Sequence, residues 1–473
     1  MPAPESQKSG QPGASGHQLR RALGLWAAMS IVIGTVIGSG IFRVSSEMVN
    51  AAGSPSRVFT VWIFGGILTF FGALTYAELS AALPAAGGEY VYLNAAYGPF
   101  FGFVYGWTQT WVAKAASLAA LATLFYTYLA DFLPGLLAPV YTVPLPIGPD
   151  WQPLEIRYGQ LLGIGIILVV AANNYVGVRF GGGAQVVFTV LKVALIGGLI
   201  AAGLLSGKAS PANLQTSVPA VPGGVPGFFK ALVAALWAYD GWNNAGMMGS
   251  EIEHPQRNLP RALIGGTLGV IAVYLLTNLA YFSVLSAGEV GASPRVASDM
   301  MLRVVGPRGE ALVSVAVMIS IFAALNGSLL SGSRIPFAMA RDGWFFRAAG
   351  RVHPRFRTPS AGIILLGAWS SLLLLSGRYD QLYTMVIFPS WILYGMTAVS
   401  VIVLRYRRPD LDRPYRVLGY PVIPLAFVMA AMALLYSTLR TSPRESGIGF
   451  ALIVLGLPFY FYWKRSAARP DLT

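Results

Sequence analysis

Long apolar stretches recur along the whole chain and constrain its fold more than any other feature. Twelve of them have about the 20-residue length of a membrane-spanning helix, and each is bounded by polar or Pro- and Gly-rich breaks. They lie at about 22–49, 57–83, 98–130, 157–175, 183–206, 227–250, 261–286, 309–338, 360–377, 380–404, 419–439 and 446–463. Backbone that faces lipid must satisfy its own hydrogen bonds, and a closed barrel would show alternating segments of only about 10 residues. The pattern therefore predicts an all-α membrane protein with 12 transmembrane helices.

Composition excludes several classes of function. Only 11% of the 473 residues are charged, against roughly 25% in soluble domains, which argues against an ordinary cytosolic enzyme. The chain has no cysteine, and its three histidines (His17, His254 and His353) are far apart in the sequence. We therefore expect no disulfide, no metal site and no cofactor. Residues 1–17 are polar and lack the pattern of a cleaved signal peptide.

The distribution of basic residues predicts the orientation in the membrane. With both termini in the cytoplasm, 19 of the 33 Lys and Arg residues fall on the inside, ten on the outside and four within spans. Cytoplasmic loops carry the basic excess in membrane proteins. The net charge of +14 therefore indicates a multi-pass protein of the cell (inner) membrane with both termini cytoplasmic, and no nucleic-acid partner. The arginine-rich inside connections 341–359 and 405–418 would face anionic lipid headgroups.

Two of the spans are interrupted by residues that a lipid-facing helix would not contain. The first carries Gly34, Gly38 and Gly40 near its middle, where Gly34 and Gly38 alone would indicate only close helix packing. The sixth carries Asp240, followed by two asparagines and flanked by glycine. An ionisable residue at that depth indicates a functional site, although a buried Asp paired only for structural reasons is the alternative.

Interrupted segments at corresponding places in two halves are typical of inverted-repeat secondary transporters. Unwinding at residues 38–40 would free backbone N–H groups at the positive end of a half-helix, which suits a carboxylate. Unwinding near residues 237–241 would free carbonyl groups, which suit an ammonium group. Together the two breaks predict a receptor for a zwitterion, of which a free amino acid is the common example.

Several motifs in and around these spans resemble the amino acid–polyamine–organocation superfamily and, within it, bacterial members of the L-type amino-acid transporter family. They are GTVIGSGIF (34–42), YAEL (76–79), PAAGGEY (84–90), FTVLK (188–192), AYDGWN (238–243), EIEHPQRNLP (251–260) and NGSLLSGSR (326–334). The resemblance covers about residues 20–440 and implies a LeuT-like fold with a 5+5 inverted repeat and broken helices 1 and 6. The implied division is an N-terminal tail (1–21), helices 1–5 (22–206), helices 6–10 (207–404), helices 11–12 (405–463) and a C-terminal tail (464–473).

The resemblance also implies a substrate site. The N–H groups of Ser39 and Gly40, with the Ser39 hydroxyl, would hold the substrate carboxylate, and the carbonyls of Val36, Trp237 and Asp240 would hold its amine. Trp237 would be the outer gate, and Ser390 in the tenth helix would line the side-chain pocket. The complete expected set is Val36, Ile37, Gly38, Ser39, Gly40, Trp237, Ala238, Tyr239, Asp240 and Ser390.

Lys192 lies about ten residues into the fifth span, which is deep for a lysine that reaches back to the interface. By resemblance it stands where sodium-coupled relatives of the fold bind Na⁺, and it tethers helices 1, 5 and 8. Its expected partners are the unwound segment near Gly38 and the eighth helix around Ser328 and Ser331. A fixed ammonium there argues against sodium coupling.

Other charged residues leave alternatives open. Asp240 stands where many animal members of the family have glycine, so it could bind protons, favour small substrates or pair with a neighbour. Lys114 in the third span is either a structural tie or a charge on the substrate pathway. Glu78 and Glu89, near the inner end of the second span, are interpreted as structural. Animal members join a glycoprotein through a cysteine, and because this chain has none we expect no such partner.

The predicted function is a sodium-independent, alternating-access exchanger of neutral L-amino acids, in which helices 1, 2, 6 and 7 rock against 3, 4, 8 and 9, as the resemblance implies. The alternatives are a proton-coupled amino-acid symporter and a carrier of cationic amino acids or polyamines. A membrane enzyme would need a cluster of reactive side chains at one depth, and Asp240 is the sole deep acid in the central spans. A channel filter sequence and an ATP-binding G-x-x-x-x-G-K-[ST] motif are both absent from the sequence.

Overall fold

The computed structural model describes residues 18–144, 153–376, 379–441 and 443–467. Most of the expected N-terminal tail (1–21) and part of the expected C-terminal tail (464–473) lie outside these ranges. The first half of the chain contains α1 (Leu25–Val36), η1 (Gly40–Phe42), α2 (Val44–Ala52), α3 (Pro55–Ala82), α4 (Glu89–Tyr97), α5 (Pro99–Thr108), η2 (Gln109–Ala113), α6 (Lys114–Leu129), η3 (Pro134–Leu137), β1 (Pro139–Val143), β2 (Leu154–Arg157), α7 (Tyr158–Val176), α8 (Val178–Leu205) and η5 (Pro211–Gln215).

The second half is also mainly helical. It contains α9 (Gly224–Ala238), η6 (Trp242–Met247), α10 (Pro255–Val284), α11 (Ala287–Ala292), α12 (Val296–Val305), α13 (Pro307–Gly332), α14 (Arg334–Arg341), η7 (Arg347–Gly350), α15 (Ser360–Ser376), α16 (Tyr379–Arg407), α17 (Val422–Thr441), α18 (Pro443–Val454) and α19 (Leu457–Ala467).

The helices account for all 12 predicted spans. Within the described residues, eight helical runs are long and apolar enough to cross a membrane, and they match the second, third, fourth, fifth, seventh, eighth, eleventh and twelfth predicted spans. The remaining four are the interrupted run α1–η1–α2, the interrupted run α9–η6, the 17-residue α15 and the 29-residue α16. Interruption by glycine and polar residues shortens the helical pieces of the first and sixth spans, as the sequence predicts.

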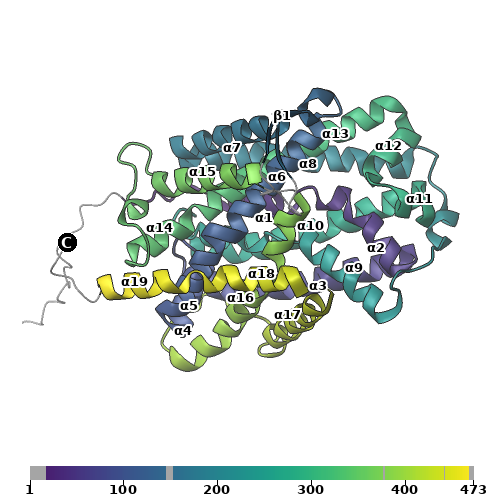
Figure 1. Ribbon diagram of the computed structural model, residues 1–473. Coiled ribbons are helices and arrows are strands. Elements are labelled where there is room, and N and C mark those ends of the chain that lie inside the picture. Colours follow the sequence, from purple (N-terminus) through teal and green to yellow (C-terminus); the bar gives the residue numbers. More distant parts are fainter. Residues whose placement is uncertain (1–17, 145–152, 377–378, 442, 468–473) are drawn as a thin grey trace, which may run out of the picture.

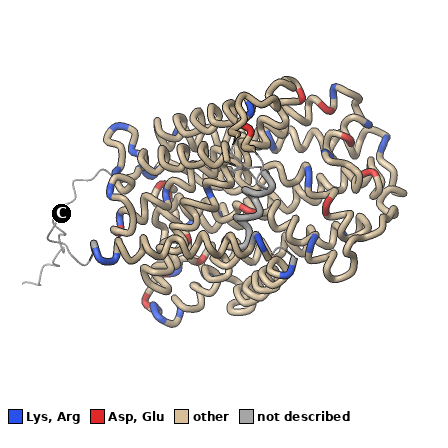
Figure 2. Tube along the Cα trace, in the orientation of Figure 1, with Lys and Arg blue, Asp and Glu red and all other residues tan. Residues whose placement is uncertain are grey.

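The long helices run between two ends of different charge. One end carries α4, α14 and the end of α19, and the other carries α2, α11 and α12 (Figure 1). Basic residues gather at the first end, whereas the second end mixes acidic and basic residues (Figure 2). This is the asymmetry that the positive-inside rule associates with a cytoplasmic and an outer face.

A short hairpin departs from the all-helical prediction. β1 and β2 pair antiparallel, with Val143 opposite Leu154 and Pro139 opposite Arg157 across an irregular step. They lie in the connection between α6 and α7, which we expected only as a Pro- and Gly-rich segment. Water outside the membrane can satisfy the open edges of a two-stranded sheet, and the Val, Tyr, Thr and Ile residues favour strands there.

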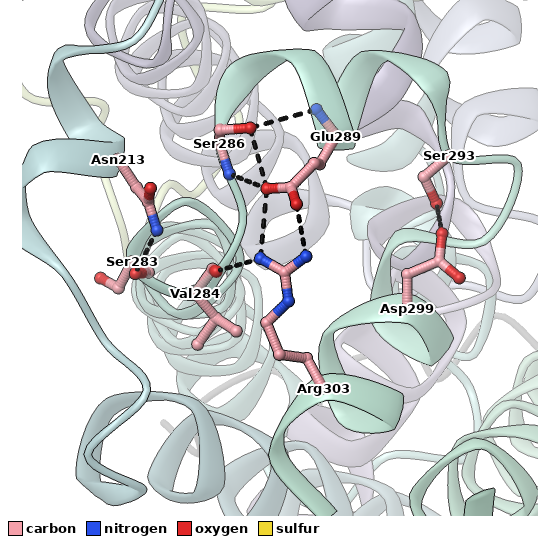
Figure 3. Close-up of polar contacts among 8 residues, drawn as sticks. All are labelled: Asn213, Ser283, Val284, Ser286, Glu289, Ser293, Asp299 and Arg303. Atoms are coloured by element: carbon pink, nitrogen blue, oxygen red, sulfur yellow. Dashed lines mark hydrogen bonds and ion pairs between the residues drawn. The ribbon is translucent and has the colours of Figure 1, made fainter. Parts of the chain in front are cut away.

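The end of the bundle with α2 carries two short helices that are joined by polar contacts. Ser286 and Glu289 form a capping box at the start of α11, with the Ser286 N–H donating to Glu289 Oε2 at 2.8 Å. Arg303 from α12 donates to both oxygens of Glu289 and to the Val284 carbonyl (Figure 3). These contacts hold residues 283–303 together beside α2, against which α11 packs.

The broken helices lie in the centre of the bundle. α1 packs against α8, α10 and α13, and η6 packs against α1, α3, α10 and α13. In contrast, α8 and α17 expose many large apolar side chains, such as Val187, Val190 and Met429, as expected for helices that face lipid. The interruptions are thus enclosed by other helices, and unwound backbone is tolerated at membrane depth where protein buries it or where it lines a cavity.

Candidate substrate site

The first break begins where α1 ends at Val36. Gly38 N–H turns back to the Val36 carbonyl at 2.8 Å, and the chain resumes as η1 from Gly40. Within the described residues, the N–H groups of Ser39 and Gly40 donate no hydrogen bond to the protein. Gly34, one turn earlier, serves close packing, since a Cβ there would lie 2.0 Å from the Gln185 amide nitrogen. The glycines of this span therefore divide between helix packing and the break itself.

The second break lies between α9 and η6. α9 ends at Ala238, and Gly241 has a φ of +103°, a conformation that favours glycine. The Thr35 hydroxyl lies 2.9 Å from the Gly241 carbonyl and 2.7 Å from the Ile31 carbonyl of its own helix, so its single proton can serve either. The Tyr274 hydroxyl lies 3.0 Å from the Val36 carbonyl and 2.8 Å from the Ala238 carbonyl, so its single proton can serve either broken helix. These contacts hold the two breaks side by side.

A cavity of about 80 Å³ lies between the two breaks. Seven of the ten expected substrate-binding residues line it. The lining residues are Thr35, Val36, Gly38, Ser39, Gly40, Lys114, Ser117, Leu121, Trp237, Ala238, Asp240, Gly241, Asn244 and Ser328.

Three expected residues are not part of this lining. Ile37 is buried and its carbonyl faces Lys192 instead. Tyr239 points into the bundle, where its hydroxyl donates to the Trp62 carbonyl at 3.3 Å. Ser390 is buried in α16 without lining the cavity. For Ile37 and Tyr239, the side chains leave the cavity because the chain turns sharply at each break.

Lys192 is fully buried and donates to three backbone carbonyls. Its Nζ lies 2.9 Å from Gly34 O, 2.5 Å from Ile37 O and 2.9 Å from Ser320 O. The Ser320 hydroxyl donates to Ile37 O at 2.9 Å and is 3.0 Å from Gly38 O. Three acceptors match the three protons of an ammonium group. Lys192 thus joins the fifth and eighth spans to the last turn of α1.

The expected partners of Lys192 on the eighth span are wrong. Ser320, rather than Ser328 or Ser331, meets the ammonium, because Ser328 lies eight residues, or about 12 Å, further along α13. Ser328 lines the cavity instead, and the Ser331 hydroxyl donates to Gly327 O within its own helix at 2.8 Å.

A second lysine, Lys114, faces the cavity itself. It follows the π-helical turn η2 and donates to the Asn244 side-chain oxygen at 2.6 Å. Asp240, across the cavity, accepts a hydrogen bond from the Tyr394 hydroxyl at 2.8 Å. π-helical turns are frequent at functional sites because they displace the helix face. Lys114 and Asp240 give the cavity one group of each charge.

Trp237 is part of the cavity wall at the end of α9. A Cβ on Gly40 would lie 3.3 Å from its ring and 3.0 Å from the Ala238 Cβ, so the two broken helices touch here. The position is suitable for a gate, which stays a prediction.

Sequence reasoning missed four residues that build the site: Thr35, Tyr274, Ser320 and Tyr394. A signal for Tyr274 exists, because Tyr274, Thr277, Asn278 and Tyr281 make a polar stripe at helical spacing in an apolar span, and all four are buried. Ser320 and Tyr394 have no comparable signal. Within the described residues, no group of three or more His, Asp or Glu side chains could hold a metal ion.

Two broken helices that enclose a small polar cavity in a bundle of membrane-spanning helices define the class of secondary transporters. The comparison with known proteins is more specific. A sequence model described as "Amino acid permease" matches residues 23–458, and the chain belongs to this family. The predicted resemblance is thereby confirmed, and the 12-helix fold with broken first and sixth spans agrees with it.

Relatives from bacteria and animals match nearly the whole chain. The chain is 33% identical over 453 residues to the serine/threonine exchanger SteT of Bacillus subtilis, covering 95% of this chain and 98% of that protein. It is 31% identical over 461 residues to the b(0,+)-type amino acid transporter 1 of Homo sapiens, covering 96% and 91%. It is 31% identical over 472 residues to the large neutral amino acids transporter small subunit 2 of Mus musculus, covering 98% and 85%.

Proposed function

We propose that the protein is a sodium-independent, alternating-access exchanger of neutral L-amino acids. The observation that carries the proposal is the pairing of free N–H groups at Ser39 and Gly40 with the second break across one cavity. The N–H groups would bind the substrate carboxylate at the positive end of η1 and α2. The carbonyls of Val36, Trp237 and Asp240 would bind the substrate ammonium.

Lys192 supports independence from sodium. Its ammonium already supplies a positive charge to the carbonyls at the end of α1, where a cation would otherwise bind between the first and eighth spans. Residues 22–206 and 207–404 would form the two inverted repeats, and the spans that contain the breaks would move against the rest. With Lys192 in the place of a bound sodium ion, a sodium gradient would not drive uptake, which favours exchange of one amino acid for another.

The cavity favours small substrates. One water molecule occupies ~10–15 Å³ of cavity volume measured in this way. The cavity of about 80 Å³ therefore has room for a solute of roughly five to eight non-hydrogen atoms. Alanine, serine and threonine fall in this range. The hydroxyls of Ser117 and Ser328 add polar groups to the wall, and the relative from Bacillus subtilis is named a serine/threonine exchanger.

Asp240 keeps a second candidate function open. Its carboxylate at the cavity could bind a proton in a symport cycle or the charged side chain of a cationic substrate. Lys114 in the same wall opposes the cationic substrate, because its ammonium would repel a second positive charge. We therefore rank proton-coupled symport second and carriage of cationic amino acids or polyamines third.

The proposal includes location and partners. The protein would lie in the cell (inner) membrane with both termini cytoplasmic and would carry out no covalent chemistry. It would work without a disulfide-linked subunit, because the chain has no cysteine.

Counterflow in proteoliposomes tests the proposed function. Vesicles that contain purified protein and one unlabelled amino acid are given a labelled panel of neutral, cationic and acidic amino acids. We expect uptake of small neutral amino acids only when the vesicles contain substrate, in buffers with or without sodium. Protein-free liposomes are the control. Uptake of no amino acid would refute transport, and uptake into empty vesicles driven by a pH gradient would favour symport.

A further inference from the structure

One buried acid is not used by the proposed substrate site. Glu89 is the first residue of α4, in the connection between the second and third spans, and its side chain is fully buried. The Asn243 side-chain amide donates to its Oε1. Its Oε2 is buried and has no hydrogen-bond partner within the described residues. Buried polar atoms are normally paired, so this oxygen calls for an explanation.

Other buried acids in the described part of the chain have arginine partners. Glu251 accepts two hydrogen bonds from Arg334, at 2.7 and 2.9 Å. Glu78 accepts two from Arg405, at 2.6 and 2.9 Å. No basic group lies within 4.0 Å of Glu89 among the described residues. An ionised Glu89 would therefore be a buried charge with a hydrogen bond from Asn243 but without a basic partner, and a buried charge without a counter-charge costs several kcal/mol.

The groups around Glu89 do not balance its charge. The charge of Lys114 on α6 acts on Glu89 and also on Asp240, so one ammonium faces two carboxylates. The other titratable neighbours are hydroxyls: Tyr76 on α3, Tyr92 on α4, Tyr394 on α16 and Tyr105 on α5. Of these, the Tyr105 hydroxyl acts on the Glu89 carboxyl most directly, as a hydrogen-bonding group. Two charged groups lie at the C-terminal ends of helices that pack on α4. Asp342, after α14, accepts a hydrogen bond from the Tyr90 hydroxyl, and Arg407, the last residue of α16, donates to the Ala96 carbonyl.

We propose that Glu89 is a proton-binding site and that its proton must be bound for α4 to stay packed on the unwound part of the sixth span. Asn243 and Asn244 are adjacent in η6, and they contact Glu89 and Lys114 respectively. The partner of Glu89, Asn243, is thus the neighbour in sequence of Asn244, which lines the cavity. Burial raises the pKa of the Glu89 carboxyl to about 7, so both forms are populated near neutral pH.

The direction of the pH effect follows from this raised pKa. Below about pH 7 the carboxyl is protonated and α4 packs on η6; above it, ionisation weakens that packing. For a single group with a pKa of about 7, the protonated fraction falls roughly tenfold between pH 6 and pH 8. The expected effect on transport, a lower exchange rate at higher pH, rests on the proposed function, in which η6 rearranges during an alternating-access cycle.

The transport test compares amino-acid exchange at equal pH on both sides of the membrane, from pH 6 to pH 8. We expect the wild-type rate to fall roughly tenfold, and the Glu89→Gln rate to stay within about twofold, because glutamine has the same shape and no charge. Glu310→Gln, at an exposed position on α13, is the control and keeps the wild-type profile. A pH response that persists in Glu89→Gln, or one that disappears in Asp240→Asn instead, would overturn the proposal.

Infrared difference spectra of the purified protein between pH 6 and pH 8 test the site without transport. We expect a carboxylic acid C=O band that is lost at pH 8 and is absent from Glu89→Gln. A wild-type spectrum without this band, or the same band in Glu89→Gln, would overturn the proposal. If no amino acid is transported, the proposed function fails while the infrared result still decides whether Glu89 holds a proton.

Discussion

The two buried lysines of the core occupy opposite kinds of site. Lys192 is 0% exposed and donates only to backbone carbonyls, on the side of α1 that faces α8 and α13. Lys114 is 8% exposed, lines the cavity and donates to a side-chain oxygen. Lys192 thus satisfies the backbone around the first break, whereas Lys114 faces the solute that occupies the cavity.

The partners of each lysine determine what its charge can do. Backbone carbonyls cannot titrate or change rotamer, so Lys192 serves as a fixed structural link between the broken helix and its neighbours. Asn244 and Asp240 can rotate or exchange partners, so Lys114 can respond to substrate. We therefore expect loss of Lys192 to damage stability and transport together, and loss of Lys114 to change mainly the apparent affinity.

Lys192→Met should have the largest effect. It removes the ammonium donor from the carbonyls of Gly34, Ile37 and Ser320, of which Ile37 O keeps the Ser320 hydroxyl, and each buried group left unsatisfied costs about 1–3 kcal/mol. We expect exchange to fall at least about 100-fold and the melting temperature in detergent to drop clearly. Wild-type exchange kinetics in this variant would reduce Lys192 to a bystander.

Lys114→Met is the matched substitution at the other lysine. It removes one hydrogen bond to Asn244 and the positive charge near Asp240, but leaves the backbone around the breaks intact. We expect the half-saturating substrate concentration to rise about tenfold, equivalent to about 1.4 kcal/mol, with a smaller loss of melting temperature than in Lys192→Met. Equal destabilisation by the two substitutions would erase the distinction between the sites.

A pair of glycines tests the cavity itself. A Cβ at Gly40 would lie 3.0 Å from the Ala238 Cβ and 3.1 Å from its Cα, so Gly40→Ala should push the broken helices apart and slow exchange about five- to tenfold. At Gly38 the nearest atoms would be 3.8 and 3.9 Å away, so Gly38→Ala has space and is the matched control. Initial exchange rates measure both variants. Equal rates for the two variants would speak against the close contact at Gly40.

Arg303→Gln, far from both lysines, should have the smallest effect. Arg303 lowers the pKa of Glu289 to about 2, by hydrogen bonding first and with help from the Ser286 backbone. The pair stabilises the fold above the ordinary glutamate pKa, and the contribution is lost as the pH falls toward 2. Because both side chains are 43% exposed, we expect a loss of only ~0.2–1 kcal/mol at neutral pH and none at pH 2. Thermal melting at the two pH values checks this, and a larger loss at acidic pH would contradict it.

The sequence predicted features that stand out against an apolar background. Aspartate and lysine are rare at mid-membrane positions, so Asp240 and Lys192 could be identified without a structure, and glycines that cluster mid-span marked the first break. Serine and tyrosine are different, because a helical serine can satisfy itself on its own backbone, as Ser331 does on Gly327. Only packing decides that Ser320, among the serines of α13, meets Lys192.

Long-range folding explains what else was missed. Glu89 follows a short connection and was interpreted as structural, yet α4 folds back and places its carboxyl beside Asn243, 154 residues later. The same holds for Tyr394, whose contact with Asp240 joins residues 154 positions apart. No spacing pattern within one helix encodes such contacts.

The most direct test of the account is the sodium dependence of exchange by the wild-type protein. Proteoliposomes loaded with unlabelled serine are given labelled serine in buffers that contain sodium, potassium or choline as the main cation. Because Lys192 supplies the fixed charge between the first and eighth spans, we predict the same exchange rate in all three. A rate that rises and saturates with sodium would contradict the account.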